Sequence, residues 1–339
     1  MSGFFFVRFW ICSCRPSFPL ARQTVKKILL LINPQARTGE GIFSEIKEAI
    51  LKSGHELVEL SETEIKEDFN AIVRRYAGSV DLVIIGGGDG SVNYLLPSLT
   101  ETKIPFIVYP LGTANLLAKS FNIEGNIESL LDLIDHGNSV TIDLGKVNGK
   151  LFINVCGLGI STEVNKKLPS KLKKLTGKFS FWIMGLKLRK TLKPFKITLS
   201  ADDRLAVFTK TWQITICNGR TYGNWMTIDP DAAYDDKTLY CLSTEVKRWW
   251  EGIRLLPSYL KGDYRQLHEV TFLKGKKIKI ESRKPLNIDV DGDVQTCTPA
   301  LFEIVPDALR IIIPTEIQED IPLNKIPVES VLANESVQS

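Results

Sequence analysis

An apolar segment that ends in clustered glycines constrains this chain more than any other stretch. Residues 83–93 read Val-Ile-Ile-Gly-Gly-Gly-Asp-Gly-Ser-Val-Asn, and a helix is expected over residues 94–99. Glycines allow positive φ angles and the close approach of a ligand, and the N–H groups at a helix start favour an anion. The segment therefore predicts a phosphate-binding turn between a buried strand and a helix, with a plain strand-to-helix turn as the alternative.

This turn lies within an alternation of predicted strands and helices. The predicted strands cover residues 27–32, 55–60, 80–85 and 105–109. Helical apolar stripes fall at residues 42–50, 69–76 and 116–121. Such an alternation predicts a doubly wound, mostly parallel sheet, in which ligands bind beyond the carboxyl ends of the strands. The polar or glycine-rich segments at such ends are residues 33–41, 86–93 and 110–115.

The second half of the chain has a different pattern, in which short apolar segments alternate with turn residues. Its predicted strands cover residues 151–155, 195–200, 205–208, 212–217, 238–243, 276–281 and 286–290. Regularly spaced short strands predict an antiparallel sandwich or barrel. We therefore expect an α/β nucleotide-binding domain over residues 26–143 and an all-β domain over residues 144–314. An N-terminal extension (1–25) and a polar, mobile tail (315–339) flank them.

Composition excludes several classes of protein. The 339 residues are 44% apolar, which suits a globular protein with a real core, and the net charge of only +4 gives no global nucleic-acid signal. The six cysteines form no C-x-x-C pair, which fits free thiols in a reducing cytoplasm. No run of 18 or more apolar residues occurs, so we predict no transmembrane helix.

The glycine-rich turn differs from the common nucleotide loops. The chain contains no GxxxxGK[ST] loop, and Ser91 stands where the last glycine of a dinucleotide GxGxxG would fall. The HRD and DFG elements of protein kinases are absent, and so is the G-x-S-x-G nucleophile elbow of hydrolases. The nucleotide chemistry therefore belongs to another class.

Three motifs in the first half resemble the diacylglycerol kinase catalytic domain family. They are Asn33-Pro34 after the first strand, Gly87–Ser91 after the third, and residues 110–115 (Pro-Leu-Gly-Thr-Ala-Asn) after the fourth. The family includes soluble bacterial diacylglycerol kinases, related bacterial lipid kinases and sphingosine kinases. The resemblance implies an NAD-kinase-like α/β domain followed by a β-sandwich. NAD kinases share the GGDG element and are the nearest alternative.

The resemblance continues through the second half and covers residues 25–313. Residues 152–159 are similar to the family's F-x-N-x-x-x-x-G element, residues 218–236 to its NG…P-x-A…DDG segment, and residues 289–293 to its D-G-E element. The resemblance implies ATP and Mg²⁺ as cofactors. The nucleotide-binding residues that it implies are Asn33, Pro34, Thr63, Gly87, Gly88, Asp89, Gly90, Ser91, Asn93, Gly112 and Thr113.

The resemblance also implies two metal sites. Asp89 and Asp143 belong by analogy to the active-site metal network, where Mg²⁺ prefers carboxylate oxygens. Asp236, with the main-chain carbonyls of Ala233 and Thr238, corresponds to a second, structural site, for which a plain Asp-Asp turn is the alternative. Family members often carry a further aspartate at the position of Leu116, so this chain lacks one carboxylate.

Asp291 and Asp293 fall on the catalytic D-G-E element. One of them would accept the proton of the lipid hydroxyl, since two neighbouring carboxylates raise the pKa of one toward the working pH. Asp293 replaces the usual, longer glutamate, so we rank Asp291 slightly ahead as the base. A solvated Asp-Gly hairpin turn is the alternative interpretation.

A basic and aromatic stretch predicts a membrane contact. Residues 164–201 carry eleven Lys or Arg and no acid, with aromatic residues interleaved. Such a surface at residues 166–196 suits an anionic lipid interface, although a solvated charged face is an equal alternative, and no motif indicates nucleic-acid binding.

The sequence therefore predicts a cytoplasmic, peripherally membrane-associated, Mg-dependent lipid kinase that converts diacylglycerol to phosphatidic acid. The alternatives are an NAD kinase, a sphingoid-base kinase and a catalytically degraded lipid or nucleotide binder. A homodimer is left open.

Overall fold

The structure is a computed structural model. It describes residues 24–33, 39–58, 60, 68–167, 193–202, 204, 206–222, 226–246, 251–264, 267–315 and 323. The predictions for Pro34 and Thr63, for most of the stretch 166–196, and for nearly all of the extension 1–25 and the tail 315–339 lie outside these residues.

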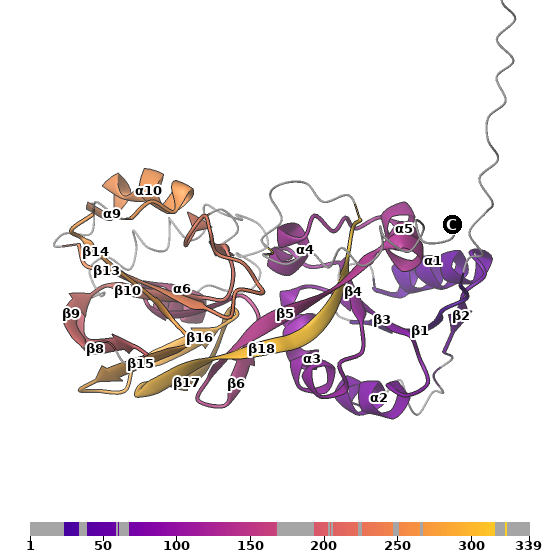
Figure 1. The fold of residues 1–339 in the computed structure, drawn as a ribbon, viewed down its shortest axis with the longest axis horizontal. Helices are drawn as coiled ribbons and strands as arrows, with labels where there is room; N and C mark the ends of the chain where they lie inside the picture. The colour runs from indigo at the N-terminus through magenta and orange to yellow at the C-terminus, as the bar shows by residue number, and fades with distance from the viewer. Residues whose placement is uncertain are drawn as a thin grey trace, which may run out of the picture.

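The first domain is built on a parallel sheet. Strands β1 (Lys27–Ile32), β3 (Leu82–Gly87) and β4 (Phe106–Pro110) pair in parallel, and the short β2 (Glu56–Leu57) pairs with β1. These strands are apolar along their length, so both faces of the sheet have to be covered. In Figure 1, α1 (Gly39–Lys52) and α5 (Ile127–His136) lie on one side, and α2 (Phe69–Tyr76) and α3 (Asp89–Thr102) on the other. The predicted doubly wound sheet is confirmed.

The described residues of the second domain form two large antiparallel layers and a short two-stranded sheet. One has the strand order β14-β13-β10-β7-β16-β17, and β15, β8 and β9 extend the large sheet over the other layer. The strands are β6 (Lys150–Phe152), β7 (Val155–Gly159), β8 (Phe195–Ala201), β9 (Val207–Thr211), β10 (Gln213–Cys217), β11 (Thr221–Tyr222), β12 (Met226–Thr227), β13 (Leu239–Thr244), β14 (Val270–Gly275), β15 (Lys277–Ser282), β16 (Asn287–Val290) and β17 (Asp293–Cys297). The described helices are α6 (Ile160–Lys167), α9 (Glu251–Arg254) and α10 (Leu256–Lys261). The predicted antiparallel β domain is confirmed.

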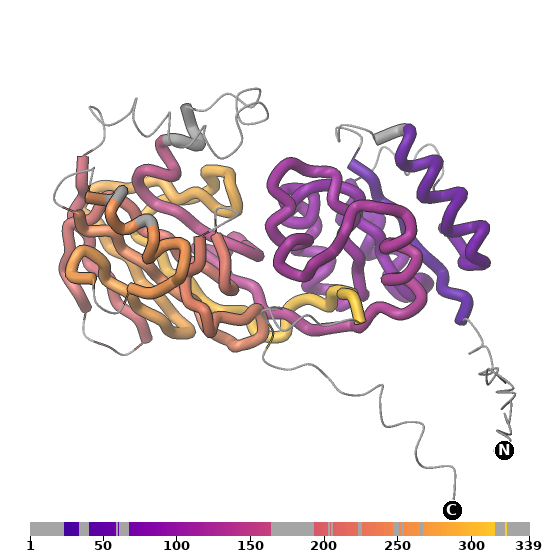
Figure 2. The backbone as a smooth tube through the Cα atoms, turned by 90° about the horizontal axis from the view of Figure 1, so that it is seen from above, coloured from indigo at the N-terminus to yellow at the C-terminus, as the bar shows by residue number. Residues whose placement is uncertain are grey.

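Two long strands join the domains. β5 (Asn138–Val147) and β18 (Ala300–Ile313) pair antiparallel along both domains, with a register shift between Val305 and Leu309. Figure 2 shows the two lobes and the chain passing between them along one side. The end of β18 also pairs with β4 in parallel, with Ile311 opposite Phe106. The last strand therefore completes the sheet of the first domain. The predicted boundary at residue 143 assigns this strand to the second domain alone.

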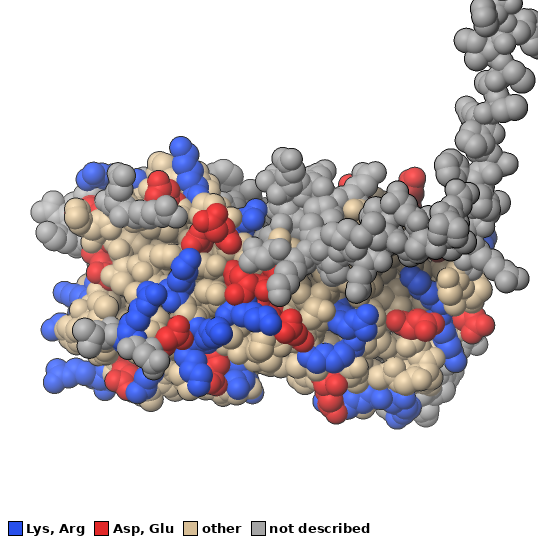
Figure 3. Space-filling view, viewed as in Figure 1, with Lys and Arg blue, Asp and Glu red and all other residues tan. Residues whose placement is uncertain are grey.

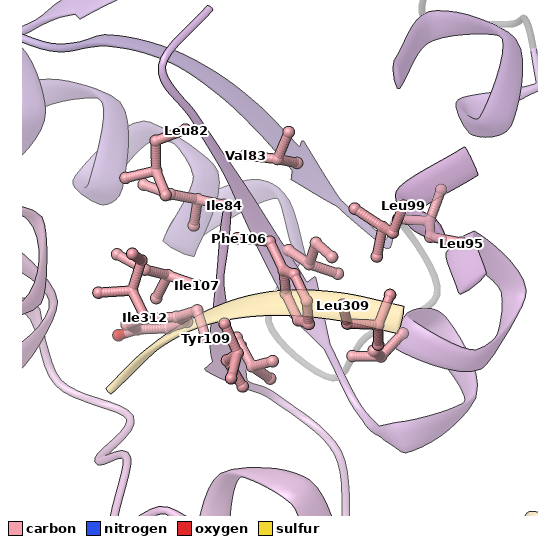
Figure 4. Packing of buried hydrophobic residues seen from close by; sticks show 14 of the residues in the cluster. Leu82, Val83, Ile84, Leu95, Leu99, Phe106, Ile107, Tyr109, Leu309 and Ile312 are labelled. Atoms are coloured by element: carbon pink, nitrogen blue, oxygen red, sulfur yellow. The ribbon is translucent and has the colours of Figure 1, made fainter. Parts of the chain in front are cut away.

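The core of the first domain depends on this returning strand. Figure 4 shows Leu95 and Leu99 of α3, Phe106 of β4 and Leu309 of β18 in one cluster, and all four side chains are buried. Burying a side chain of this size stabilises a fold by about 1.5–3 kcal/mol. The two domains are thus coupled through hydrophobic burial as well as through the backbone.

Two predicted elements in the first domain differ from the structure. Of the strand expected at 55–60, the described residues form only β2. His55 before it is buried, and its Nε2 lies 2.9 Å from Asp135 Oδ1. The helix expected to begin at Tyr94 begins at Asp89 instead, with Gly88 as its N-cap residue. The predicted phosphate loop is therefore the end of β3 followed directly by the first turns of α3.

Candidate functional site

The glycines at the end of β3 permit close packing rather than positive φ angles. Gly86, Gly87, Gly88, Gly90 and Gly112 are all absent from the residues with positive φ. A Cβ atom on Gly87 would lie 2.3 Å from Ser91 Oγ, and one on Gly112 would lie 2.6 Å from the Cα of Gly88. The two glycine-bearing segments, 86–90 and 110–115, thus approach each other most closely at Gly88 and Gly112, where a Cβ atom has no room.

Asn33 at the end of β1 makes hydrogen bonds both to the end of β3 and to the start of α3. Its backbone N–H donates to Gly86 O at 2.9 Å, and its Nδ2 donates to Ser91 Oγ at 3.1 Å. The structure therefore brings Asn33, the glycines and Ser91 together at the carboxyl ends of β1 and β3. Gly112 and Thr113 follow the end of β4 and are exposed.

A cavity of about 280 Å³ opens at this edge. Part of its wall is formed by Asn33, Gly90 and Ser91. The aromatic side chains of Phe69 and Tyr94 also line it. The hydroxyl of Tyr94 donates to Asp68 Oδ1 at 2.6 Å, which fixes the ring beside the cavity. The sequence motifs did not indicate these two aromatic residues, because Phe69 falls in a predicted apolar helical stripe and Tyr94 at the expected start of a helix.

Asp89 links α3 to α4 (Leu116–Ser120). Its Oδ2 accepts the N–H of Leu116 at 3.0 Å and its Oδ1 accepts that of Leu117 at 3.1 Å. Asn115, which precedes α4, adopts a left-handed conformation with φ 48° and donates from Nδ2 to Gly112 O. Leu116 therefore contributes its N–H to Asp89, where family members often have an additional carboxylate.

Asp143 and Asp236 hold the segment 233–238 against the strands that join the domains. Asp143 is buried on β5, and its carboxylate accepts the N–H groups of Lys237 and Asp307, both at 2.7 Å. Asp236 accepts the N–H groups of Ala233 and Thr238 and the hydroxyl of Tyr240. Burial raises the pKa of both carboxyls.

These contacts bear on the predicted structural metal site. The Asp236 carboxylate accepts hydrogen bonds from the N–H groups of Ala233 and Thr238, and the carbonyl ligand set stays a prediction. Within the described ranges, no cluster of three or more His, Cys, Asp or Glu residues forms a metal-binding group.

Asp291 lies in a tight hairpin turn between β16 and β17. Asp291 and Gly292 have φ angles of 47° and 103°, which suits the Asp-Gly turn of a two-residue hairpin. The Asp291 carboxylate turns inward instead of facing solvent, whereas Asp293 is exposed at the start of β17. The hairpin alternative was therefore correct for the backbone, and the inward carboxylate is the feature it did not anticipate.

The Asp291 carboxylate accepts four hydrogen bonds. Oδ2 accepts the N–H of Ile153 at 2.8 Å and Nδ2 of Asn93 at 2.8 Å, and Oδ1 accepts the N–H groups of Asn154 and Val155 at 3.0 and 2.8 Å. These donors interrupt the strand predicted at 151–155, because the backbone turns toward Asp291 between β6 and β7. Burial raises the pKa of Asp291 to about 6, and the hydrogen bonds oppose that rise.

Tyr234 makes a second connection between the domains near this site. Its hydroxyl donates to Asn154 Oδ1 at 2.9 Å and lies 3.4 Å from Ser120 Oγ. Its ring packs 5.2 Å from that of Phe121, centroid to centroid. We call the sheet edge at residues 33, 86–93 and 110–115 the phosphate-side edge, after its predicted ligand, and the hairpin of β16 and β17 the acidic hairpin. The structure brings these two regions together, while Asp143 and Asp236 hold the adjoining strands.

Comparisons with known proteins match both halves of the chain. Residues 27–147 match the family model described as the diacylglycerol kinase catalytic domain, and residues 154–313 match the YegS C-terminal NAD kinase beta sandwich-like domain. A diacylglycerol kinase of Bacillus subtilis is 24% identical over 305 residues, covering 88% of this chain and 99% of that protein. One from Staphylococcus aureus is 26% identical over 317 residues, covering 91% and 99%.

A solved structure agrees in fold. The crystal structure of a putative diacylglycerol kinase from Bacillus anthracis has a TM-score of 0.70 and 23% identity, and covers 86% of this chain and 98% of that one. Two family models in the right order and relatives aligned over nearly their whole length lead to one assignment. The chain thus combines a diacylglycerol kinase catalytic domain over residues 27–147 with a YegS C-terminal NAD kinase beta sandwich-like domain over residues 154–313.

Proposed function

We propose that the chain is an ATP-dependent lipid kinase that transfers the γ-phosphoryl group of ATP to diacylglycerol, giving phosphatidic acid. The relatives named diacylglycerol kinase support this acceptor. The observation that carries the proposal is the 2.8 Å hydrogen bond from Asn93 on α3 to Asp291 on the hairpin. It joins a phosphate-binding edge to a pair of carboxylates, and phosphoryl transfer needs both held phosphates and an aligned acceptor.

The nucleotide is assigned to the edge formed by β1, β3 and β4. The cavity beside Phe69 and Tyr94 is small for a whole nucleotide, so it would receive part of ATP while the phosphates extend along the start of α3. Free N–H groups and the positive end of the helix dipole favour phosphate there. Asn33, Ser91 and Thr113 offer polar groups at the same edge.

Magnesium would bind beside those phosphates. Mg²⁺ keeps several waters and is commonly held by one or two carboxylates together with substrate phosphates. Asp89 fits that pattern, because each of its oxygens accepts one backbone hydrogen bond and retains a second lone pair. When bound, the metal would neutralise charge on the transferring phosphoryl group.

The contacts favour Asp293 over Asp291 as the general base, which reverses the ranking from sequence. The four donors around Asp291 occupy its acceptor sites, whereas Asp293 is exposed two residues further on. In the proposed step the lipid hydroxyl oxygen bonds to the γ-phosphorus and its proton passes to Asp293. The bond to the β–γ bridging oxygen breaks, and ADP leaves.

A second cavity supports an apolar acceptor. It measures about 400 Å³ and lies at the end of the sandwich, where the apolar side chains of Ile160, Phe195, Trp212 and Leu286 line it. Residues 168–192, the core of the predicted membrane-contact stretch, connect two parts of this wall in sequence. An NAD kinase would need no apolar cavity for its acceptor.

Peripheral membrane contact through residues 166–196 is part of the proposal. The described helices include none that is both long and apolar enough to cross a membrane. On the face shown in Figure 3, basic and acidic side chains of the described residues are interspersed, which supports neither a nucleic-acid surface nor a membrane surface there. Co-sedimentation with anionic and neutral vesicles tests the contact, and equal binding to both would argue against it.

The acceptor is tested with radiolabelled ATP against diacylglycerol, a sphingoid base and NAD, with identification of each product. We expect labelled phosphatidic acid from diacylglycerol in mixed micelles. Label in the sphingoid base alone would move the acceptor to another lipid. Label in NAD alone would replace the proposal by an NAD kinase, and intact ATP binding without transfer to any acceptor would favour a degraded binder.

A further inference from the structure

Three side chains in the first turns of α3 connect this helix to three different elements. Asp89 binds the N–H groups that open α4, Ser91 accepts a hydrogen bond from Asn33 at the end of β1, and Asn93 donates to Asp291 in the second domain. Asp89 and Asn93 are four positions apart and lie on one face of the helix, whereas Ser91 between them points to another side. The same turns form the predicted phosphate site.

Of the four donors to Asp291, Asn93 alone comes from the first domain. The other three are backbone N–H groups of residues 153–155, which belong to the same sandwich as the hairpin. Val155 O also accepts the N–H of Asp291 at 2.9 Å, so the hairpin is well anchored within its own domain. The Asn93 amide therefore sets where this anchored hairpin lies relative to α3.

Other contacts also hold the two domains together. β5 and β18 run through both domains, and Lys103 Nζ donates to the carbonyls of Asp307 and Ala308 at 2.9 and 2.8 Å. Tyr234 reaches the hairpin through Asn154, whereas the Asn93 amide contacts the Asp291 carboxylate directly. Asn93 therefore offers the more direct route by which α3 can position Asp293.

We propose that Asn93 is a positioning residue that couples occupancy of the phosphate site on α3 to the placement of the Asp293 hairpin, acting through Asp291. This inference rests on the proposed kinase function. It gives Asn93 a role different from the nucleotide contact implied by the family resemblance. Phosphates bound at the start of α3 fix the helix turns, and Asn93 transmits that order to Asp291.

The proposal is tested first with Asn93→Ala. We expect kcat to fall by about tenfold to a hundredfold, the size of one lost hydrogen bond to a charged group, while the KM for ATP stays within about twofold. Asn126→Ala is the matched control: Asn126 caps α5 in the same domain through Ser129 N at 2.7 Å, far along the chain from the hairpin. A raised KM for ATP with unchanged kcat would instead make Asn93 a nucleotide contact and overturn the proposal.

The second variant, Asn93→Asp, gives a readout that a merely structural role would not produce. It places two carboxylates within hydrogen-bonding distance, so they must share a proton. The other titratable groups near Asp291 are Asp289, Asp293, Cys156, Cys217 and Tyr234, and the substitution alters none of these side chains. We expect kcat relative to wild type to recover as pH falls from about 8 to 6. The same deficit as in Asn93→Ala at every pH would contradict the coupling.

A readout without the acceptor separates this inference from the proposed function. Hydrogen–deuterium exchange of residues 288–297 is measured with and without a non-hydrolysable ATP analogue. We expect the analogue to slow exchange in the wild type and in Asn126→Ala but not in Asn93→Ala, with all three folded by circular dichroism. Equal protection in all three would overturn the coupling even if the wild type phosphorylates lipid, and the expected pattern would uphold it whichever acceptor is found.

Discussion

Asp89 and Asp291 both bind backbone N–H groups, but their partners lie at very different distances along the chain. Asp89 accepts from residues 27 and 28 positions away, within the succession β3-α3-β4-α4. Asp291 accepts from residues 136 to 138 positions away and from Asn93, 198 positions away. The phosphate-side edge is thus formed by contacts between residues close in sequence. The acidic hairpin depends on contacts between distant residues of both domains.

The difference has a consequence for stability and for chemistry. Damage to the local edge should impair nucleotide binding and leave the sandwich intact, because its close contacts lie within one domain. Damage to the hairpin or to the strands that join the domains should separate ATP binding from phosphoryl transfer. The variants below test the difference between the two regions, first through stability and then through activity.

Truncating a buried side chain on β18 should have the largest effect on stability. Leu309→Ala removes a fully buried side chain from the first core, although Leu309 belongs to the last strand. We expect a loss of about 2–5 kcal/mol in the free energy of unfolding, measured by denaturant titration. Leu301→Ala on the same strand, where Leu301 is 40% exposed, is the control and should cost far less. Equal losses would show that the end of β18 is not part of the first core.

The two carboxylates are compared directly with Asp291→Asn and Asp89→Asn. An amide in place of a carboxylate turns an NH₂ group toward backbone donors. We expect about 2–3 kcal/mol lost for Asp291→Asn, which faces four donors, and about half of that for Asp89→Asn, which faces two. Thermal and denaturant unfolding measure both, and a larger loss for Asp89→Asn would reverse the comparison.

The glycines of the phosphate edge offer a matched pair. Gly112→Ala would bring a Cβ within 2.6 Å of the Gly88 Cα, while a Cβ on Gly90 meets nothing within 4 Å. We expect Gly112→Ala to cost about 1–3 kcal/mol through overpacking and Gly90→Ala to unfold like the wild type. If Gly90→Ala were equally destabilised, the close packing of the two segments would not explain the motif.

The pH dependence of activity should report on Asp291. Its pKa in the folded protein is about 6, above the ordinary value of 3.8, so its contribution to stability is full below pH 3.8 and is lost as the pH rises through 6. The activity is expected to change with pH in the opposite direction and to fall as the pH falls. A proton on either oxygen of Asp291 displaces one N–H donor, and this loosens the hairpin. We expect kcat to fall about fivefold between pH 6 and 5 at saturating ATP, as the deprotonated fraction of Asp291 falls. A flat profile across pH 5–7 would contradict this assignment.

The parts of the site encoded by neighbouring residues were predictable, and the parts made by distant contacts were not. The apolar strands, the glycine segment and the doubly wound order follow from periodicity and from Gly86–Ser91, and the structure confirms that fold. The start of α3 at Asp89 was missed, since helix capping by Gly88 leaves no side-chain signal.

The environment of Asp291 could not be read from the Asp-Gly sequence. That dipeptide predicts the hairpin turn, but the inward direction of the carboxylate depends on N–H groups of residues 153–155 and on Asn93. The roles of Phe69 and Tyr94 could not be read from the sequence either, because their place beside a cavity is set by how α2 and α3 pack on the sheet.

One measurement tests most directly whether the phosphate-side edge and the acidic hairpin form a single active site. The dissociation constant of an ATP analogue and the rate of labelled phosphate transfer to diacylglycerol are measured together for the wild type and for Asp293→Asn. We predict unchanged analogue binding and a transfer rate lowered by about a hundredfold to ten-thousandfold, as expected for loss of a general base. A wild-type transfer rate in the variant would contradict the account.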